Sequence, residues 1–175
     1  MTFDVFFVIL LGNIIGDNIL ATIKLDEIDK KILNILQQNG RITNAQLASE
    51  VGLSPPPMLE RVKKLEKNGI IQKYVAVLDY PKIDKSTMVF VSLSLARHRI
   101  KSIDQVNQEI LKLPEVLECY HIAGEEDYLL KIVVKDVQEY EQFILKKLAQ
   151  ISAISKIKSY VVLSTVKSDS KILIE

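Results

Sequence analysis

The sequence predicts an α+β chain in which an N-terminal (winged) helix-turn-helix domain precedes a ferredoxin-like βαββαβ domain. Two patterns carry this prediction. Three short segments with apolar residues at helical spacing follow one another between residues 23 and 72. Alternating apolar segments and two further helical segments then succeed one another between residues 87 and 167, in the order of the split βαβ motif.

The first predicted helix spans Asp26–Gln38, where apolar residues recur every three or four positions. Asp26, Glu27 and Asp29 lie in its first turn, where the helix dipole favours negative charge. Asn39-Gly40 follows its last turn and is typical of a helix end. We therefore expect a helix that begins and ends within this segment.

A capping box opens the second predicted helix. Thr43 and Gln46 stand three residues apart, so each side chain can accept the free amide of the other residue. The helix Asn44–Val51 is short, and Gly52 ends it. A short helix followed by a glycine turn is what a helix-turn-helix motif requires between its last two helices.

Three consecutive prolines open the third predicted helix. Ser54 is a favourable N-cap residue, and Pro55 falls at the first helical position, where a missing N–H costs nothing. The predicted buried side chains are Met58, Leu59, Val62 and Leu65. The predicted solvated side chains are Glu60, Arg61, Lys63, Lys64 and Lys67. After this helix, residues 70–80 read as an extended strand.

Positive charge is concentrated in the first domain. Residues 24–74 hold nine Lys or Arg against six Asp or Glu, although the whole chain has a net charge of only +1. In a helix-turn-helix the third helix lies in the major groove and its first residues meet base edges. The basic third helix therefore favours DNA binding, and the alternative is that its lysines form only a solvated helix face.

The second half alternates strands and helices. We expect strands at Met88–Leu95, Val116–Ala123, Tyr128–Val134 and Ile157–Val166. One helix should begin at the capping box Ser102–Gln105 and run to about Leu113, and the other should span Val137–Ala149. Helices would then cover one face of the sheet. The open face predicts a homodimer or a higher oligomer.

Several function classes receive no support. The single cysteine, Cys119, excludes an internal disulfide, suits a cytoplasmic protein and reads as a buried small hydrophobe. His98 and His121 lack the spacing of a zinc site, so we expect no metal.

Residues 1–22 are apolar but interrupted by polar residues and lack a basic start. We interpret them as an extension outside the main fold, with no membrane association expected.

The residue identities in these motifs are more specific than their periodicity alone. The chain resembles the Lrp/AsnC family, the leucine-responsive or feast/famine regulators, from Leu25 to about Lys167. The resemblance is carried by LDEIDKKILNILQQNGRITNAQLASEVGLSPPPMLERVKKLEKNGII, by YVAVLDY and by AGEEDYLLKIVVKDVQEYEQF. The domains would be an extension (1–22), a helix-turn-helix domain (23–72), a linker strand (73–86), a ferredoxin-like domain (87–167) and a tail (168–175).

The resemblance implies a sequence-specific transcriptional regulator that is not an enzyme. It implies binding to double-stranded DNA, dimers that often assemble into octamers, and an amino acid or similar small effector, with no cofactor. The implied DNA-binding residues are Thr43, Asn44, Ser54, Pro56, Met58, Arg61, Lys63 and Lys64. The implied effector-binding residues are Tyr120, Ile122, Gly124, Glu126, Asp127 and Tyr128.

Elementary chemistry agrees with part of the effector site. Gly124 would let a backbone amide approach a carboxylate, and Asp127 could pair with an α-ammonium group. The alternative is that Gly124–Asp127 is only a solvated acidic turn.

The sequence departs from the family pattern at the third helix. Glu60 stands where a neutral or basic residue is usual, and we expect it to pair with Lys64. Pro56 and Pro57 replace small polar residues, so fewer side chains would read bases. Two other functions stay open. One is a sirohaem-decarboxylase-like enzyme using His98, His121, Arg97, Arg99 and tyrosines, and the other is an effector-sensing module without DNA binding.

Overall fold

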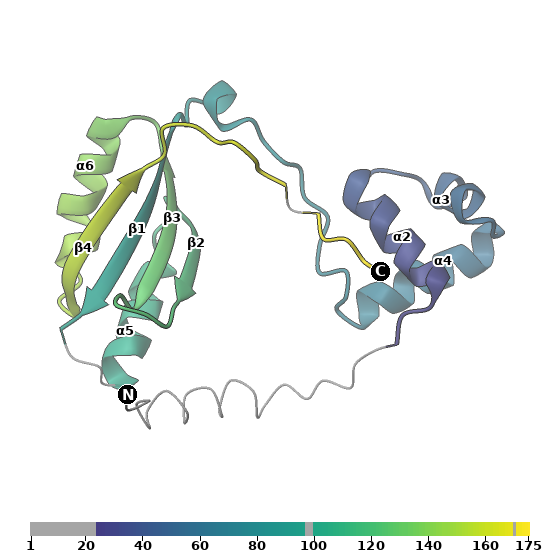
Figure 1. Cartoon of the computed structure of the whole chain (residues 1–175), viewed down its shortest axis with the longest axis horizontal. Helices are drawn as coiled ribbons and strands as arrows, with labels where there is room; N and C mark the ends of the chain where they lie inside the picture. Colours follow the sequence, from purple (N-terminus) through teal and green to yellow (C-terminus); the bar gives the residue numbers. More distant parts are fainter. Residues whose placement is uncertain (1–23, 97–99, 170) are drawn as a thin grey trace. The chain divides into compact units, whose positions relative to one another are not determined.

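The computed structural model describes residues 24–96, 100–169 and 171–175 of the chain. They fall into two compact units (Figure 1). One unit takes in the chain as far as Val75 together with Asp169–Glu175, and the other is Ala76–Ser168. The extension expected at residues 1–22 lies outside the described residues.

The three helices that the structure describes in the first unit begin at side-chain caps or at proline. They are α2 (Glu27–Gln38), α3 (Asn44–Val51) and α4 (Pro55–Lys67). The Asp26 carboxylate accepts the N–H groups of Ile28 and Asp29 at the start of α2. The capping box of Thr43 and Gln46 is present at α3, as predicted. Local pairing therefore sets where α2 and α3 start.

The turn between α3 and α4 depends on glycine, and its cap differs from the prediction. Gly52 has φ 75°, in the left-handed region that glycine adopts without strain. Ser54 occupies the N-cap position of α4, but its side chain makes no capping hydrogen bond. The reason is that Pro55–Pro57 fill the first three helical positions, so the N–H groups that an N-cap hydroxyl accepts do not exist there.

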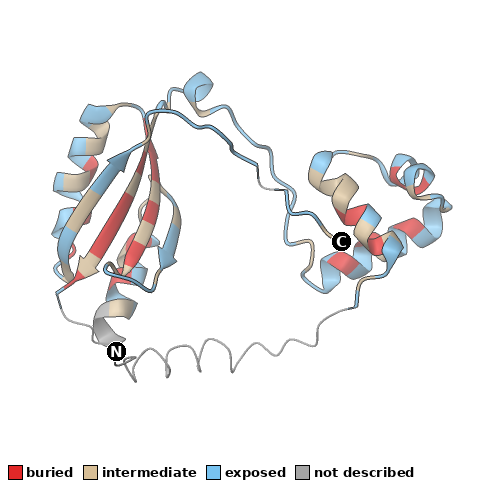
Figure 2. Ribbon diagram, viewed as in Figure 1, coloured by how far each residue is buried: buried red, intermediate tan, exposed pale blue. Residues whose placement is uncertain are grey.

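One apolar cluster holds the first unit together (Figure 2). Its buried members are Ile32, Leu33, Leu47, Ala48, Met58, Val62 and Leu65. Leu59 was predicted to belong to this buried stripe and is 37% exposed instead. Met58, Val62 and Leu65 already occupy the inward positions of α4, and Leu59 lies to one side of them.

No strand forms between α4 and the start of β1 at Thr87. The linker strand expected at 73–86 is wrong: residues 72–79 have no regular secondary structure, and Tyr80–Ile83 forms the short helix η1. A strand requires a hydrogen-bonded neighbour, and the sheet in the described residues contains only strands of the second unit.

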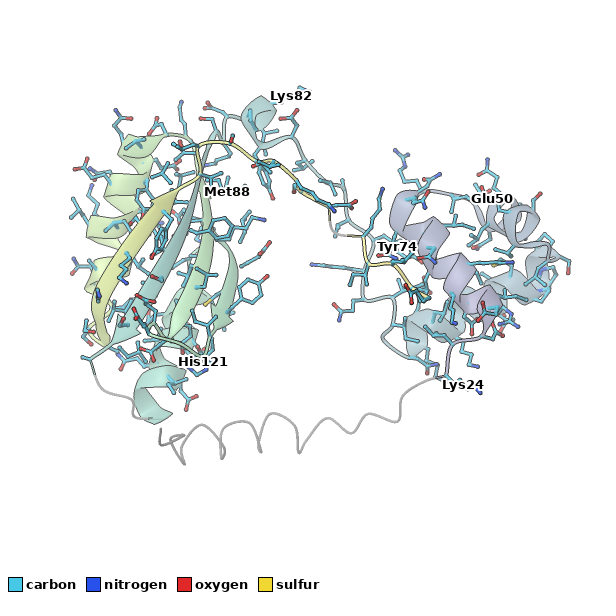
Figure 3. All side chains as sticks on the ribbon, in the orientation of Figure 1. Lys24, Glu50, Tyr74, Lys82, Met88 and His121 are labelled. Atoms are coloured by element: carbon cyan, nitrogen blue, oxygen red, sulfur yellow. The ribbon has the colours of Figure 1, made fainter. Side chains whose placement is uncertain are left out.

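The C-terminal segment packs on α2. The Gln37 amide exchanges two hydrogen bonds with the backbone of Ile172 (2.9 and 2.8 Å), and Asn34 does the same with Ile174 (3.1 and 3.4 Å). Ile174 also packs against the apolar cluster. Both isoleucines line a cavity of about 400 Å³ together with Tyr74, whose position is labelled in Figure 3. The tail is thus part of the helix-turn-helix unit.

The second unit is a four-stranded antiparallel sheet with α5 and α6 on one face (Figure 1). In chain order its elements are β1 (Thr87–Leu95), α5 (Ile100–Ile110), β2 (Val116–His121), β3 (Tyr128–Val134), α6 (Val137–Lys146), the short helix η2 (Leu148–Gln150) and β4 (Ile154–Val161). The strand order is β2-β3-β1-β4, as the ferredoxin-like prediction requires.

Several boundaries in this unit differ from the prediction: β2 ends at His121 and not at Ala123, and α6 ends at Lys146 and not at Ala149. The helix α5 starts at Ile100, so Ser102 lies within it rather than at its N-cap. The strand β4 spans Ile154–Val161 and not 157–166, because its ladder with β1 ends where Val161 pairs with Val89. Beyond that point, one hydrogen bond from the Val162 N–H to the Met88 carbonyl (2.9 Å) continues the contact.

The two faces of the sheet have different environments. The helix-covered face buries Val89, Val91, Leu93 and Leu95 of β1 with Leu130 and Ile132 of β3. On the other face Met88 and Phe90 are only half-buried. Phe90 pairs across the strands with Lys131 and Tyr160. Half-buried apolar side chains on an uncovered sheet face are typical of an association surface.

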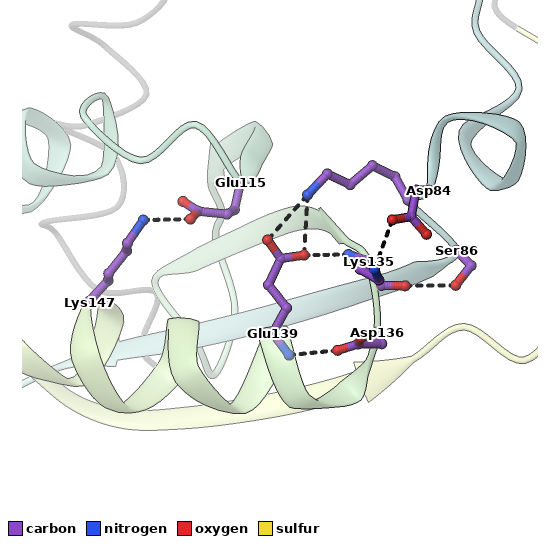
Figure 4. A network of polar contacts seen from close by, with 8 residues as sticks. Asp84, Ser86, Glu115, Lys135, Asp136, Glu139 and Lys147 are labelled. Carbon is purple, nitrogen blue, oxygen red and sulfur yellow. Dashed lines mark hydrogen bonds and ion pairs between the residues drawn. The ribbon is translucent and has the colours of Figure 1, made fainter.

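A polar network fixes the start of β1 to α6 (Figure 4). Lys85 donates to both oxygens of the Glu139 carboxylate (3.2 Å each), and the Lys135 ammonium lies 2.9 Å from Asp84. The Ser86 hydroxyl donates to the Lys135 carbonyl (2.7 Å). The N–H of Lys135 and the Lys85 ammonium together lower the pKa of Glu139. These contacts anchor the chain where it enters the sheet.

Candidate nucleic-acid interface and effector region

The helix α4 presents exposed cations. Lys63, Lys64 and Lys67 are all solvent-exposed. Glu60 pairs with Lys63 at 3.3 Å rather than with Lys64 as expected, which leaves the positive excess of this face intact. An exposed basic helix that follows a short helix and a glycine turn suits the phosphate backbone of DNA.

Arg61 points back into its own unit. Its Nη1 lies 2.6 Å from Asp26 Oδ2 and 2.8 Å from Asp29 Oδ1. Both carboxylates raise the pKa of Arg61, Asp26 most strongly. The Asp29 N–H first and then the Arg61 guanidinium lower the pKa of Asp26. The two ion pairs of Arg61 therefore connect α4 to the start of α2.

The other predicted DNA-binding residues fall into two groups. Thr43, Asn44, Ser54 and Pro56 are exposed, at the first turn of α3 and the first turn of α4. Met58 is fully buried in the apolar cluster, so the expectation that its side chain contacts DNA is wrong. Leu59 is exposed instead, and its offset from the spacing of Met58, Val62 and Leu65 is the sequence signal that could have found it.

The predicted effector turn is attached to the end of β1. The Ile122 N–H donates to the Asp127 carbonyl (2.9 Å) and closes the turn. The Asp127 N–H donates to the Leu93 carbonyl (2.8 Å), and one oxygen of its carboxylate accepts the Leu95 N–H (2.7 Å). The acidic turn is therefore built into the sheet and is not only a solvated loop.

The remaining predicted effector residues surround this turn. Glu126 pairs with Lys158 of β4, which lowers the pKa of its carboxyl. Tyr128 is buried, donates to Asn107 (2.9 Å) and has a pKa raised to about 12, mainly by burial. Tyr120 is exposed and donates to Glu118 (2.9 Å). One end of the sheet thus brings together both charged and aromatic groups.

Gly124 does not need to be glycine within this chain. It lies outside the left-handed region, and a Cβ on it would meet no atom within 4 Å. No contact within the described chain therefore requires glycine at this position, and close approach of a ligand to its backbone stays a prediction.

A larger cavity lies against the open face of the sheet. It has a volume of about 800 Å³, and Met88, Phe90 and Lys131 line its floor. Its walls come from the segment 162–168 and from the linker residues Val77, Leu78, Tyr80 and Pro81. This concave surface combines apolar side chains with Lys85, Lys131 and Lys167, and it belongs wholly to the second unit.

Other sequence expectations have mixed outcomes. Cys119 is exposed and not buried, because it lies on the edge strand β2. Among the residues that the structure describes, no three His, Cys, Asp or Glu side chains gather as a metal site. None of the helices in the described ranges is long and apolar enough to cross a bilayer. Residues 97–99, which include His98, lie outside the described residues.

Comparisons with known proteins agree with both units. A winged helix-turn-helix DNA-binding family matches residues 25–72, and the Lrp/AsnC ligand binding domain matches residues 88–172. The leucine-responsive regulatory protein of Escherichia coli K12 is 41% identical over 151 residues, covering 86% of this chain and 92% of that protein.

Solved structures share the whole architecture. A transcriptional regulator from Neisseria meningitidis, in complex with L-Met, has a TM-score of 0.82 at 35% identity, covering 85% of this chain and 96% of that chain. An AsnC family transcriptional regulator from Agrobacterium tumefaciens has a TM-score of 0.80 at 36% identity, with the same coverage. The chain therefore belongs to the Lrp/AsnC family of transcriptional regulators.

Proposed function

We propose that this regulator binds double-stranded DNA as a homodimer and that an amino acid changes that binding. The observation that carries the proposal is the set of exposed lysines on α4, directly after the Gly52 turn. In a helix-turn-helix this helix enters the major groove. The residues proposed to contact DNA are Thr43, Asn44, Ser54, Pro56, Lys63 and Lys64.

Arg61 has a supporting role in this proposal. Its guanidinium is engaged by Asp26 and Asp29, so it positions α4 and leaves phosphate contact to Lys63 and Lys64. Each lysine at a phosphate releases condensed counterions from the duplex.

Dimerisation would cover the open sheet face. Met88 and Phe90 are half-buried there, and the cavity of about 800 Å³ offers a concave surface for a second copy. A two-fold dimer joins two helix-turn-helix units, which suits a DNA site with two half-sites. Further assembly into octamers is consistent with the family expectation.

The effector would bind beside the turn between β2 and β3. Asp127, Glu126 and Tyr120 offer anionic and hydroxyl groups at this end of the sheet. The α-ammonium group of an amino acid suits a carboxylate partner. L-methionine and L-leucine are the first effectors to test, because one structural relative is an L-Met complex and one sequence relative is leucine-responsive by name.

Genomic binding selection tests the proposal. The purified full chain is mixed with sheared genomic DNA, with and without a panel of amino acids that includes L-methionine and L-leucine. We expect recovery of a limited set of fragments, and a changed recovery with at least one amino acid. Recovery of fragments at random would contradict sequence-specific regulation. An identical set with every amino acid would contradict the effector part alone.

A further inference from the structure

The exposed start of α4 is apolar. Pro55, Pro56 and Leu59 are all exposed. Residues three or four positions apart are neighbours on a helix, so these side chains form one surface, the proline–leucine patch. Apolar side chains that group on the surface indicate contact with a partner.

Apart from the Ser54 hydroxyl, the polar groups that could read bases from this end of α4 are missing or engaged. Pro55–Pro57 have no N–H, and the Met58 N–H donates to the Ser54 carbonyl (3.3 Å). Arg61 is held by two carboxylates of its own unit. The commonest specific contact to DNA, a bidentate arginine on guanine, is therefore unavailable here.

The surroundings of the patch indicate what it contacts. Lys63 is exposed one turn beyond Leu59, and Lys64 and Lys67 follow it. The partner must therefore combine anionic groups with an apolar group. In the major groove, phosphates flank the base edges, and the apolar group on those edges is the C5-methyl of thymine.

Resting on the proposed DNA binding, we propose that the proline–leucine patch packs against thymine C5-methyl groups in the major groove. The lysines hold the backbone and give affinity for any sequence, whereas the patch gives preference for thymine. Sequence reading by this helix then depends on apolar contact at its tip.

Replacement of thymine by deoxyuracil tests this inference, because deoxyuracil pairs identically and lacks only the methyl group. Fragments recovered by the genomic selection are synthesised with thymine or with deoxyuracil, and affinities are measured for both. We expect about fourfold weaker binding for each contacted thymine that is replaced, which corresponds to about 0.8 kcal/mol for one buried methyl group.

Three variants assign the effect to the patch. Leu59→Ala should bring the thymine-to-uracil affinity ratio close to one, and Leu59→Met should retain the wild-type ratio. Lys64→Ala removes a proposed phosphate contact, so it should weaken binding to both fragments equally and leave the ratio unchanged.

Equal wild-type affinity for both fragments would overturn the inference, and so would a wild-type ratio in Leu59→Ala. A wild-type chain that bound neither fragment would overturn the proposed DNA binding itself, so the two failures are distinguishable.

Discussion

Arg61 of α4 and Asp29 of α2 form an ion pair with 2.8 Å between Nη1 and Oδ1. Asp29 is only 7% exposed, so removal of the guanidinium leaves a buried carboxylate without its cation. We expect Arg61→Ala to lower the free energy of unfolding by about 1–3 kcal/mol. Urea denaturation followed by far-ultraviolet circular dichroism measures this change.

The exposed neighbour supplies the control for that experiment. Lys63→Ala should change the free energy of unfolding by less than about 0.5 kcal/mol, as is usual for surface substitutions. Equal stability of the two variants would contradict the structural role of Arg61. Arg61→Ala should also leave the salt dependence of DNA binding unchanged, because its guanidinium is not assigned to a phosphate.

Acid should weaken the first unit through Asp26. Its folded pKa is lowered, by the Asp29 N–H and then by Arg61, below the value of about 3.9 of an unfolded aspartate. The stabilisation is therefore complete above about pH 4 to 5 and is lost as the pH falls through the lowered pKa. Asp26→Asn should flatten this acid dependence in pH-dependent urea denaturation, whereas Glu50→Gln should retain it.

The exposed lysines should set the salt dependence of DNA binding. Lys63→Ala combined with Lys64→Ala removes two proposed phosphate contacts, so the slope of log affinity against log salt should flatten by about 2. Affinity should fall for all sequences alike. The matched control is Lys112→Ala, an exposed lysine of the second unit. A slope as steep in the double variant as in the wild type would remove both lysines from the interface.

A charge on the open sheet face should prevent dimerisation. Phe90→Lys places a cation opposite Lys131, in the face where a second copy is proposed to pack. Sedimentation should show a dimer or higher oligomer for the wild type and a monomer for this variant. Val137→Lys, on an exposed position of α6, is the control and should remain associated. A wild-type chain that sediments as a monomer at micromolar concentration would contradict the proposed homodimer.

Hydrogen exchange should detect the docked tail. The N–H groups of Ile172 and Ile174 donate to the Gln37 and Asn34 side chains, so they should exchange more slowly than those of an unfolded tail. Combining Asn34→Ala with Gln37→Ala should remove this protection, whereas Gln38→Ala, at the exposed end of the same helix, should not. Rapid exchange in the wild type would mean that the tail does not dock in solution.

Local rules predicted most of the fold. The bounds of α2 and α3 follow from caps within three residues of each helix start, and the alternation of β1 and β3 follows from one buried sheet face. A local rule also explains why Ser54 makes no capping hydrogen bond: the three prolines that follow it have no N–H group for its hydroxyl to accept.

Contacts between distant segments were beyond sequence reasoning. The pairing of Arg61 with Asp29 depends on how α4 crosses α2, and no spacing in the sequence encodes it. The end of β4 depends on its register with β1. The docking of Ile174 on α2 joins residues that lie 140 positions apart. The sequence therefore predicted a tail separate from the helix-turn-helix domain.

The docked tail has a consequence for the order in which the protein matures. Domains generally fold from the N-terminus during synthesis. The helices α2, α3 and α4 are translated well before Ile174, which packs on their core. Every residue of the ligand-binding domain is translated between these two parts. The DNA-binding unit therefore reaches its finished form only after the ligand-binding domain has been synthesised.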